Sequence, residues 1–239
     1  MDANISINKI FLTKKCNHIG IIMDGNGRWA ESRSMSRLEG HRRGANNMHN
    51  VVKYAIKHDI KFITLYSFST ENWKRPQEEV DGLMRLLKRF LPKEAKQLKK
   101  NNVRLDTIGD VSRFSDDVQN AIIQSKDITA ECDGIVLILA LNYGGRDEII
   151  RSVNLLINNN EDVNEDNISN SLDTSKYPDP DLIIRTAGEY RLSNFLSWQS
   201  VYSELIFLDV FWPDFSEEDF NNSIELYYNR VRNFGGLIK

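Results

Sequence analysis

The chain alternates short apolar runs with longer segments of helical periodicity, and this alternation limits the folds open to it more than any other feature. Six runs are rich in β-branched and aliphatic residues; they lie at 18–23, 62–68, 103–109, 135–142, 181–185 and 204–210. Several are almost continuously apolar, which is typical of strands buried on both faces. Helices between such strands favour right-handed crossovers. The sequence therefore predicts an α/β fold with a central, mostly parallel six-stranded sheet flanked by helices.

The clearest helix is predicted over 76–100. Its apolar side chains from Val80 to Leu98 keep near a helical period. Pro76 suits a first helical turn, whereas Pro92 is expected to kink or interrupt the helix because it has no backbone N–H.

The chain shows no internal repeat and no linker, and its 239 residues fit one large domain. We predict a single domain over 18–236, preceded by a polar N-terminal segment at 1–17. The stretch 158–181 is rich in Asn and Asp, so it is predicted to be a surface excursion with one short helix. Strand-like runs lie on both sides of it, so it does not divide two domains.

Composition excludes several classes of function. The formal net charge is only −3, so no overall field attracts nucleic acid, and no nucleic-acid partner is expected. The first residues are too polar for a signal peptide, and no apolar run approaches the roughly 20 residues that span a bilayer. Cys16 and Cys132 form no CxxC motif, which favours reduced thiols. The expected location is the cytoplasm.

The segment 24–28, Asp-Gly-Asn-Gly-Arg, directly follows the first predicted strand. Glycines between a strand and a helix permit a tight turn and leave backbone N–H groups free to face an anion. Arg28 adds a charged fork for phosphate oxygens. Asp24 would repel a bare phosphate, but a carboxylate and a phosphate together suit Mg²⁺. The pattern predicts a metal–diphosphate site, with a plain turn and a solvent-facing Asp24 as the alternative.

Two other chemistries fit this segment less well. An EF-hand loop starting at Asp24 would need glycine at its sixth position and glutamate at its twelfth, where Trp29 and Met35 stand. A phosphohydrolase with Asp24 as nucleophile would resemble enzymes with a second acid two residues later, where this chain has Asn26. The EF-hand is excluded, and the phosphohydrolase stays as an alternative.

Two more polar clusters follow later strands. Segment 67–79 combines hydroxyls, an amide, acids and Arg75, with an ordinary capped helix start as the alternative. Segment 183–195 contains Arg185 and Arg191, which suit a second anionic group, with surface ion pairs as the alternative. Because ligands bind outside the carboxyl ends of parallel strands, the loops are predicted to be neighbours.

Two single residues add to these clusters. Glu204 opens the last predicted strand and is a candidate second metal ligand, although an exposed glutamate explains it equally simply. His41, in the segment GHRRGA, is a candidate phosphate donor or a structural hydrogen-bonder.

Six segments together resemble the successive motifs of the cis-prenyltransferases, the family that includes the bacterial undecaprenyl diphosphate synthases. In chain order they are HIGIIMDGNGRWA, GHRRGA, LYSFSTENWKRP, NYGGRDEI, DLIIRTAGEYRLSNFLSWQ and ELIFLDVFWPDF. The match runs from about His18 to Gly236, and the first and fifth motifs are highly specific. The resemblance implies a cis-prenyltransferase-like fold.

The resemblance also implies the reaction and the site. Isopentenyl diphosphate would be joined to an allylic diphosphate, expected to be farnesyl diphosphate, with Mg²⁺ as cofactor and Asp24 and Glu204 as its ligands. Asp24 would be catalytic. Asn72 would be the proton acceptor, or, because a carboxamide is hardly basic, would orient substrate or a proton-accepting phosphate oxygen. The implied substrate-binding residues are Gly25, Asn26, Gly27, Arg28, Trp29, Arg37, His41, Ser69, Thr70, Glu71, Trp73, Arg75, Arg185, Arg191, Leu192 and Ser193.

The implied product is a long cis-polyprenyl diphosphate such as undecaprenyl diphosphate, a lipid-carrier precursor for cell-wall and glycan synthesis. It needs an apolar channel, which the helix at 76–100 and the strand at 135–141 could line, with plain core packing as the alternative. The resemblance implies a homodimer in which residues near the C-terminus approach the partner's site. Peripheral contact with a membrane for product release is left open.

The chain departs from the family pattern at two positions. Ala187 replaces the first glycine of a pair, a mild change unless that position needs a positive φ. Tyr190 stands where some members carry a histidine near the metal. A non-catalytic, diphosphate-binding subunit of the family is the second alternative. The residues whose retention argues against it are Asp24, Arg28, Asn72, Arg185 and Arg191. The segment 116–120 does not supply the DDxxD motif of trans-prenyltransferases.

Overall fold

The computed structural model describes residues 15–230, so most of segment 1–17 and the end of the predicted domain lie outside the described residues. All six predicted strands are present, as β1 (His18–Ile22), β2 (Phe62–Ser69), β3 (Val103–Ile108), β4 (Ile135–Tyr143), β5 (Leu182–Arg185) and β6 (Glu204–Phe207). They form one sheet in the order β3-β4-β2-β1-β5-β6, and every pairing is parallel. The predicted fold class is confirmed.

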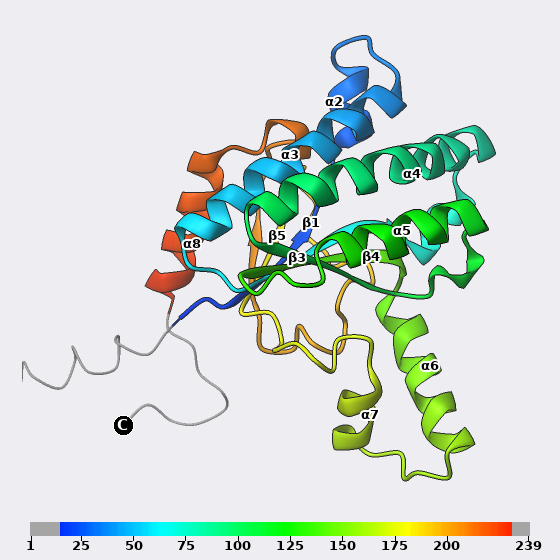
Figure 1. The fold of residues 1–239 in the computed structure, drawn as a ribbon. Helices are drawn as coiled ribbons and strands as arrows, with labels where there is room; N and C mark the ends of the chain where they lie inside the picture. The colour runs from blue at the N-terminus through cyan, green and yellow to red at the C-terminus, as the bar shows by residue number, and fades with distance from the viewer. Residues whose placement is uncertain (1–14, 231–239) are drawn as a thin grey trace, which may run out of the picture.

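Helices cover the sheet on both sides (Figure 1). The α-helices are α2 (Asn26–Glu31), α3 (Arg37–Lys57), α4 (Gln77–Lys100), α5 (Asp116–Ile128), α6 (Gly145–Asn158), α7 (Glu165–Ser171) and α8 (Glu217–Asn229). Short 3₁₀ helices are η2 (Thr70–Lys74), η3 (Val111–Arg113) and η4 (Trp212–Asp214). Helices α3, α4, α5 and α8 share one face of the sheet, and α6 and α7 project on the other side. No helix in the described part of the chain is long and apolar enough to cross a membrane.

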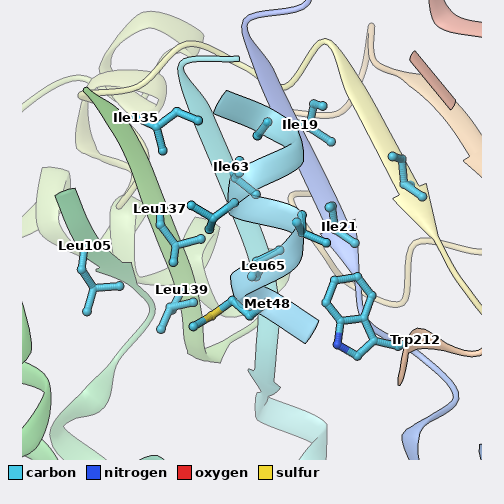
Figure 2. Close-up of a cluster of buried hydrophobic side chains, with 14 of the residues drawn as sticks. Ile19, Ile21, Met48, Ile63, Leu65, Leu105, Ile135, Leu137, Leu139 and Trp212 are labelled. Atoms are coloured by element: carbon cyan, nitrogen blue, oxygen red, sulfur yellow. The ribbon is translucent and has the colours of Figure 1, made fainter. Parts of the chain in front are cut away.

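The main core lies between the sheet and α3 (Figure 2). Alternate residues of the central strands, among them Ile19, Ile63 and Leu137, point toward this helix, and Met48 of α3 lies beside Leu139. None of these residues is more than 5% exposed. The other residues of the same strands face a second core closed by Phe195. Apolar packing on both faces explains why the strands are nearly continuous apolar runs.

Helix α4 runs without a break through Pro92, so the expected interruption is wrong. Proline removes one helical hydrogen bond, a loss that packing on either side of it offsets. Leu91 and Ala95, which flank it, are buried at 2% and 0% exposure. The predicted surface excursion is also present, and α7 is its short helix.

His18 at the start of β1 should make the fold sensitive to acid. Its Nδ1 lies 2.6 Å from the Pro178 carbonyl oxygen and its Nε2 lies 2.8 Å from Thr64 Oγ1. Burial lowers the pKa of His18 to about 4, against partial compensation by the Pro178 hydrogen bond and the Asp181 charge. The unfolded chain therefore binds this proton more readily, and stability falls as pH drops from about 6.5 toward 4.

We expect His18→Gln to remove part of this dependence. Between about pH 7.5 and pH 4.5, wild type should lose roughly 2 kcal/mol more unfolding free energy than the variant. Urea titrations at both pH values measure this difference. His58→Gln, at the less buried end of α3, is the control and should follow wild type. Parallel pH dependence in wild type and His18→Gln would contradict the assignment.

Candidate active site

Three loops meet at the carboxyl edge of the sheet, where β2, β1 and β5 lie side by side. They follow Ile22, Ser69 and Arg185, the last residues of these strands. The chain leaves β1 toward β2 on one side and later returns to β5 on the other, which makes β1 a topological switch point. The predicted neighbourhood of the three polar clusters is confirmed.

The loop after β1 is a tight turn in which Gly25 is required and Gly27 lets Arg37 approach closely. Gly25 has φ 100°, and a Cβ there would lie 2.7 Å from Phe211 and 2.9 Å from the Ala187 side chain. A Cβ on Gly27 would lie 2.6 Å from the Arg37 guanidinium carbon. Both positions therefore keep backbone and guanidinium groups close around a small cavity. Asp24, Asn26, Arg28, His41 and Arg75 also line that cavity.

Asp24 is held by donors on both carboxylate oxygens. The Gly25 N–H donates to Oδ1 (2.7 Å) and Arg185 Nη2 donates to Oδ2 (2.8 Å), while Arg28 Nη2 lies 3.4 Å from Oδ1. Burial by itself raises the pKa of Asp24, but the Arg185 hydrogen bond and charge, the Gly25 N–H and the Arg28 charge together lower it. Asp24 is therefore ionised at neutral pH.

Arg185 is the most deeply buried cation of the site, at 4% exposure. Its Nη1 donates to Ser193 Oγ (2.7 Å) and to the Arg191 carbonyl oxygen, so it ties the third loop to the first. Its Nε is buried and has no hydrogen-bond partner among the described residues. Asn26 Oδ1 is likewise buried and unpaired. Buried polar atoms without a partner are rare in folded proteins, and here they belong to Arg185 and Asn26, which line the two polar cavities.

The second loop contributes Ser69 and Asn72 to a larger cavity, which Asp24 and Arg185 also line. Asn72 Oδ1 accepts a hydrogen bond from the Ser69 N–H (3.1 Å). No described residue accepts from Asn72 Nδ2, so the group that Asn72 offers a ligand is a donor. Glu71 lies in the same cavity and accepts from Asn194 Nδ2 (2.9 Å).

Glu79, near the start of α4, connects three predicted phosphate-binding side chains. Its Oε1 accepts from Arg75 Nη1 (3.0 Å) and lies 3.3 Å from His41 Nε2, and its Oε2 accepts from Arg37 Nε (3.2 Å). Burial lowers the pKa of His41, as does the charge of Arg75, against the opposite effect of Glu79. His41 is therefore neutral at pH 7 and acts as a hydrogen-bonding group. Glu79 orients the cluster, a role that the sequence did not reveal.

We expect Glu79→Gln to lower turnover by about 10- to 100-fold, because the predicted phosphate-binding groups would be held less firmly and lose their alignment. Steady-state kinetics should show the loss in kcat more than in KM. The pKa of His41, read by NMR titration, should fall further, since the nearby arginines would act without a counter-charge. Glu78→Gln, one residue away and exposed, is the matched control. An unchanged His41 titration in Glu79→Gln would show that Glu79 does not hold this cluster.

An apolar cavity opens from the same cluster. Asn26 and His41 line both the small polar cavity and the apolar one. Its remaining walls come from Met23, Met48, Leu83, Leu86, Leu87, Phe90, Leu91, Leu139 and Trp212, among others. Leu83, Leu91 and Leu139 also belong to the main core. The apolar residues of α4 and β4 therefore serve as core and as cavity wall at once.

Several predicted substrate-binding residues point elsewhere. Trp29 Nε1 donates to Asp214 (2.7 Å) and Trp73 Nε1 donates to Asn142 (2.7 Å). Leu192 packs into the second core, and Thr70 lies against Gly144. None of these four lines the two polar cavities. They support the loops rather than contact the space between them.

The structure does not bring Glu204 to Asp24. Glu204 is level with Leu182 at the amino end of β5, whereas Ile22, just before Asp24, is level with Arg185 at its carboxyl end. The backbone positions of the two residues are therefore more than roughly 10 Å apart along the strands. Glu204 instead pairs with Arg230 (2.9 Å). Residues 15–230 contain no group of three His, Cys, Asp or Glu side chains able to hold a metal.

The third loop is conformationally unusual. Ala187, Ser193, Asn194 and Leu196 all have positive φ, as does Gly188. Position 187, with φ 74°, is thus one where glycine is favoured, and alanine costs about 1 kcal/mol there. Tyr190 stands where the resembled family has a histidine in some members. It is 72% exposed, its ring lies beside that of Phe207, and it supplies no metal ligand. Such strain is common at functional sites.

Tyr66 is a second residue of the site that the sequence did not single out. It lines the larger polar cavity, and its ring stacks on Phe195 with centroids 4.7 Å apart. Its hydroxyl lies 3.2 Å from the Tyr143 carbonyl oxygen and 3.3 Å from that of Ser193, and it can donate its one proton to either. In the sequence, Tyr66 is recognisable only as a strand residue two positions before Phe68 in β2, and nothing there indicates that it belongs to the site.

Glu189 neutralises part of the positive charge of the site. Glu189 forms ion pairs with Arg28 (3.3 Å) and with Arg191, whose side chain is 61% exposed. The two arginines of the first and third loops therefore share one carboxylate. A polyanion that entered the site would compete with Glu189 for them.

Comparisons with known proteins agree with this geometry. Residues 22–235 match the family described as "Putative undecaprenyl diphosphate synthase". An isoprenyl transferase of Wolinella succinogenes is 50% identical over 220 residues, which cover 92% of this chain and 96% of that one. A Micrococcus luteus protein named ditrans,polycis-undecaprenyl-diphosphate synthase ((2E,6E)-farnesyl-diphosphate specific) is 44% identical and covers 98% and 96% of the two chains.

The fold is shared with a solved plant enzyme. Lavandulyl diphosphate synthase from Lavandula x intermedia, crystallised with dimethylallyl diphosphate, superimposes with a TM-score of 0.87 at 36% identity over 92% of this chain and 98% of that one. Fold, motifs and relatives therefore place this chain in the undecaprenyl diphosphate synthase family, as an enzyme of the cis-prenyltransferase class. The resemblance seen in the sequence is confirmed.

Proposed function

We propose that this enzyme condenses isopentenyl diphosphate with an allylic diphosphate, farnesyl diphosphate, to make a long cis-polyprenyl diphosphate, undecaprenyl diphosphate. The observation that carries the proposal is the continuity of its cavities. Two polar cavities share Asp24 and Arg75, and the smaller one adjoins an apolar cavity at Asn26 and His41. A molecule with a diphosphate head and a hydrocarbon tail matches this order of surroundings.

The two polar cavities suit two diphosphates. We assign the smaller one, with Arg28, Arg37 and Arg75, to the allylic diphosphate, because it leads to the apolar cavity. The larger one, with Arg185 and Ser193, then takes isopentenyl diphosphate. The allylic carbon–oxygen bond breaks, pyrophosphate leaves, a carbon–carbon bond forms, and one proton is lost to fix the new double bond. Arginines around the leaving group stabilise its growing negative charge.

The donor set around Asp24 fits Mg²⁺ that arrives with a diphosphate. A single carboxylate cannot hold the ion alone, but Mg²⁺ is often bound by one or two carboxylates together with phosphate oxygens and water. When bound, the ion would neutralise charge on the leaving pyrophosphate. Asp24 is the ligand from this chain, and Glu204 lies too far away to join it within one subunit.

For Asn72 we propose an orienting role. Its Oδ1 is occupied by the Ser69 N–H, so its free Nδ2 donates to a substrate or phosphate oxygen. A phosphate oxygen of the diphosphate then takes the proton. The phosphohydrolase alternative loses support, because Asn26 stands where such an enzyme would need its general acid.

We also propose a cytoplasmic homodimer. Exposed apolar side chains support a partner surface; they include Ile150 and Ile157 of α6 and Val201, at 60%, 58% and 70% exposure. Both cysteines, Cys16 and Cys132, are buried, and no disulfide joins them, which suits a reducing compartment.

The test uses purified protein with farnesyl diphosphate, labelled isopentenyl diphosphate and Mg²⁺. We expect a long-chain product with cis double bonds, lost on chelation by EDTA and restored by added Mg²⁺. Extraction, sizing and NMR of the product measure both properties. If both diphosphates bind but no elongation occurs, the chain is the non-catalytic subunit of the family and the proposed reaction is wrong.

A further inference from the structure

A row of cations runs along the outer side of α4. Arg85, Arg89, Lys93, Lys96 and Lys100 recur at spacings of three and four residues and therefore share one side of the helix. We call these five residues the basic stripe. All are exposed. Within residues 15–230 none of them forms an ion pair, whereas Lys88, off the stripe, pairs with Asp117 (2.6 Å).

The stripe borders a groove between α3 and α4. Its rim carries Arg42, Arg85, Arg89 and Lys93 against one carboxylate, Glu39, which already binds Arg42 and Arg43. The groove is thus a local positive region on a chain whose net charge is −3. Unpaired cations around a groove attract polyanionic surfaces.

The groove also has an apolar part. Leu38, 40% exposed, reaches from α3 to Gly82 of α4, and Met35, 41% exposed, lies just before α3. Leu86 and Phe90 line this groove and also line the apolar cavity inside the protein. A wall one side chain thick therefore separates the inner cavity from the basic groove.

We propose that the basic stripe and the α3–α4 groove dock the enzyme on an anionic membrane surface. Cations would contact lipid phosphates while Met35 and Leu38 enter the interface, as in other peripheral surfaces that combine both features. This inference rests on the proposed function in one respect: docking would allow a lipid product held behind Leu86 and Phe90 to pass into the membrane.

Vesicle binding tests the proposal without any substrate, so its result does not depend on whether the enzyme elongates chains. The full chain is mixed with vesicles of phosphatidylcholine alone or with about one third phosphatidylglycerol, and bound protein is measured by sedimentation. The triple variant Arg85→Gln, Arg89→Gln, Lys93→Gln should bind anionic vesicles about 100-fold more weakly than wild type. Its elongation rate in detergent should match wild type.

The matched control removes the same charge elsewhere. Lys15→Gln, Lys57→Gln, Lys61→Gln removes three exposed lysines from the amino edge of the sheet and should bind like wild type. A fluorophore on Leu38→Cys should shift to the blue with anionic vesicles, whereas one on Ile123→Cys of α5 should not. The native thiols are buried and leave the label specific.

Each outcome decides the question. Binding that depends on phosphatidylglycerol and on the stripe, with a shift at position 38, supports the proposal. Equal binding by the stripe variant and the control, or no binding to anionic vesicles, overturns it. A stripe variant that changes oligomeric state instead of vesicle affinity would show that an acidic protein surface covers the groove, which also overturns it.

Discussion

Asp24→Asn is expected to lower the elongation rate about 1,000-fold while the protein stays folded, because the change removes the negative charge at the proposed metal–diphosphate site. Asparagine has the same shape and can still accept the Gly25 N–H with Oδ1. It cannot supply the negative oxygen that Arg185 now contacts at 2.8 Å. The pKa of Asp24 is lowered in the folded enzyme, so wild type carries this charge throughout the neutral range.

Steady-state elongation with both diphosphates at saturation measures the rate, and circular dichroism checks the fold. Calorimetry of pyrophosphate binding adds a readout separate from turnover: Mg²⁺ should tighten binding to wild type but not to Asp24→Asn. Asp110→Asn, which follows β3 at the same edge of the sheet but outside the cavities, should stay within about twofold of wild type. Retention of more than about a tenth of the wild-type rate in Asp24→Asn would refute the assigned role.

Arg185→Lys is expected to lower kcat/KM for isopentenyl diphosphate about 100-fold, although the charge is kept. One nitrogen of the Arg185 guanidinium binds Asp24, while another binds Ser193 and the Arg191 carbonyl oxygen. A lysine ammonium is a single point of charge and cannot occupy both positions. The variant should also lose about 1–3 kcal/mol of stability, because a buried polar partner is left unpaired.

The loss should appear mainly with isopentenyl diphosphate varied, while KM for the allylic diphosphate changes little. Arg191→Lys is the matched comparison, because the Arg191 side chain is exposed and a lysine at this position can still form the ion pair with Glu189. We expect it to lose less than about tenfold. If the two variants were equally active, the buried fork of Arg185 would not be what holds the second diphosphate.

Most of the fold could be predicted because its determinants are local. Continuous apolar runs marked β1 to β6, and helical periodicity marked α4, since each pattern depends only on neighbouring residues. Pro92 was the exception: its local preference is real, but packing of Leu91 and Ala95 against the core outweighs it.

The site was predictable only as a set of loops. The alternation of strands and helices predicted parallel strands, and therefore placed the three polar clusters at one edge of the sheet. The structure brings Asp24, Asn72 and Arg185 to one cavity there. Side-chain direction was not predictable. Trp29 and Trp73 stand within the motifs yet turn toward Asp214 and Asn142.

The sequence by itself determined the fold class, the family and the three loops that form the candidate site, because hydrophobic periodicity and motif order are properties of consecutive residues. Only the tertiary structure decided which side chains meet. Glu79 contacts Arg37, His41 and Arg75, whereas Glu204 lies at the amino end of the strands, away from the candidate site. Such contacts depend on strand order and register, which bring together residues that are distant in the chain. The sequence around each residue therefore gives no indication of its partner.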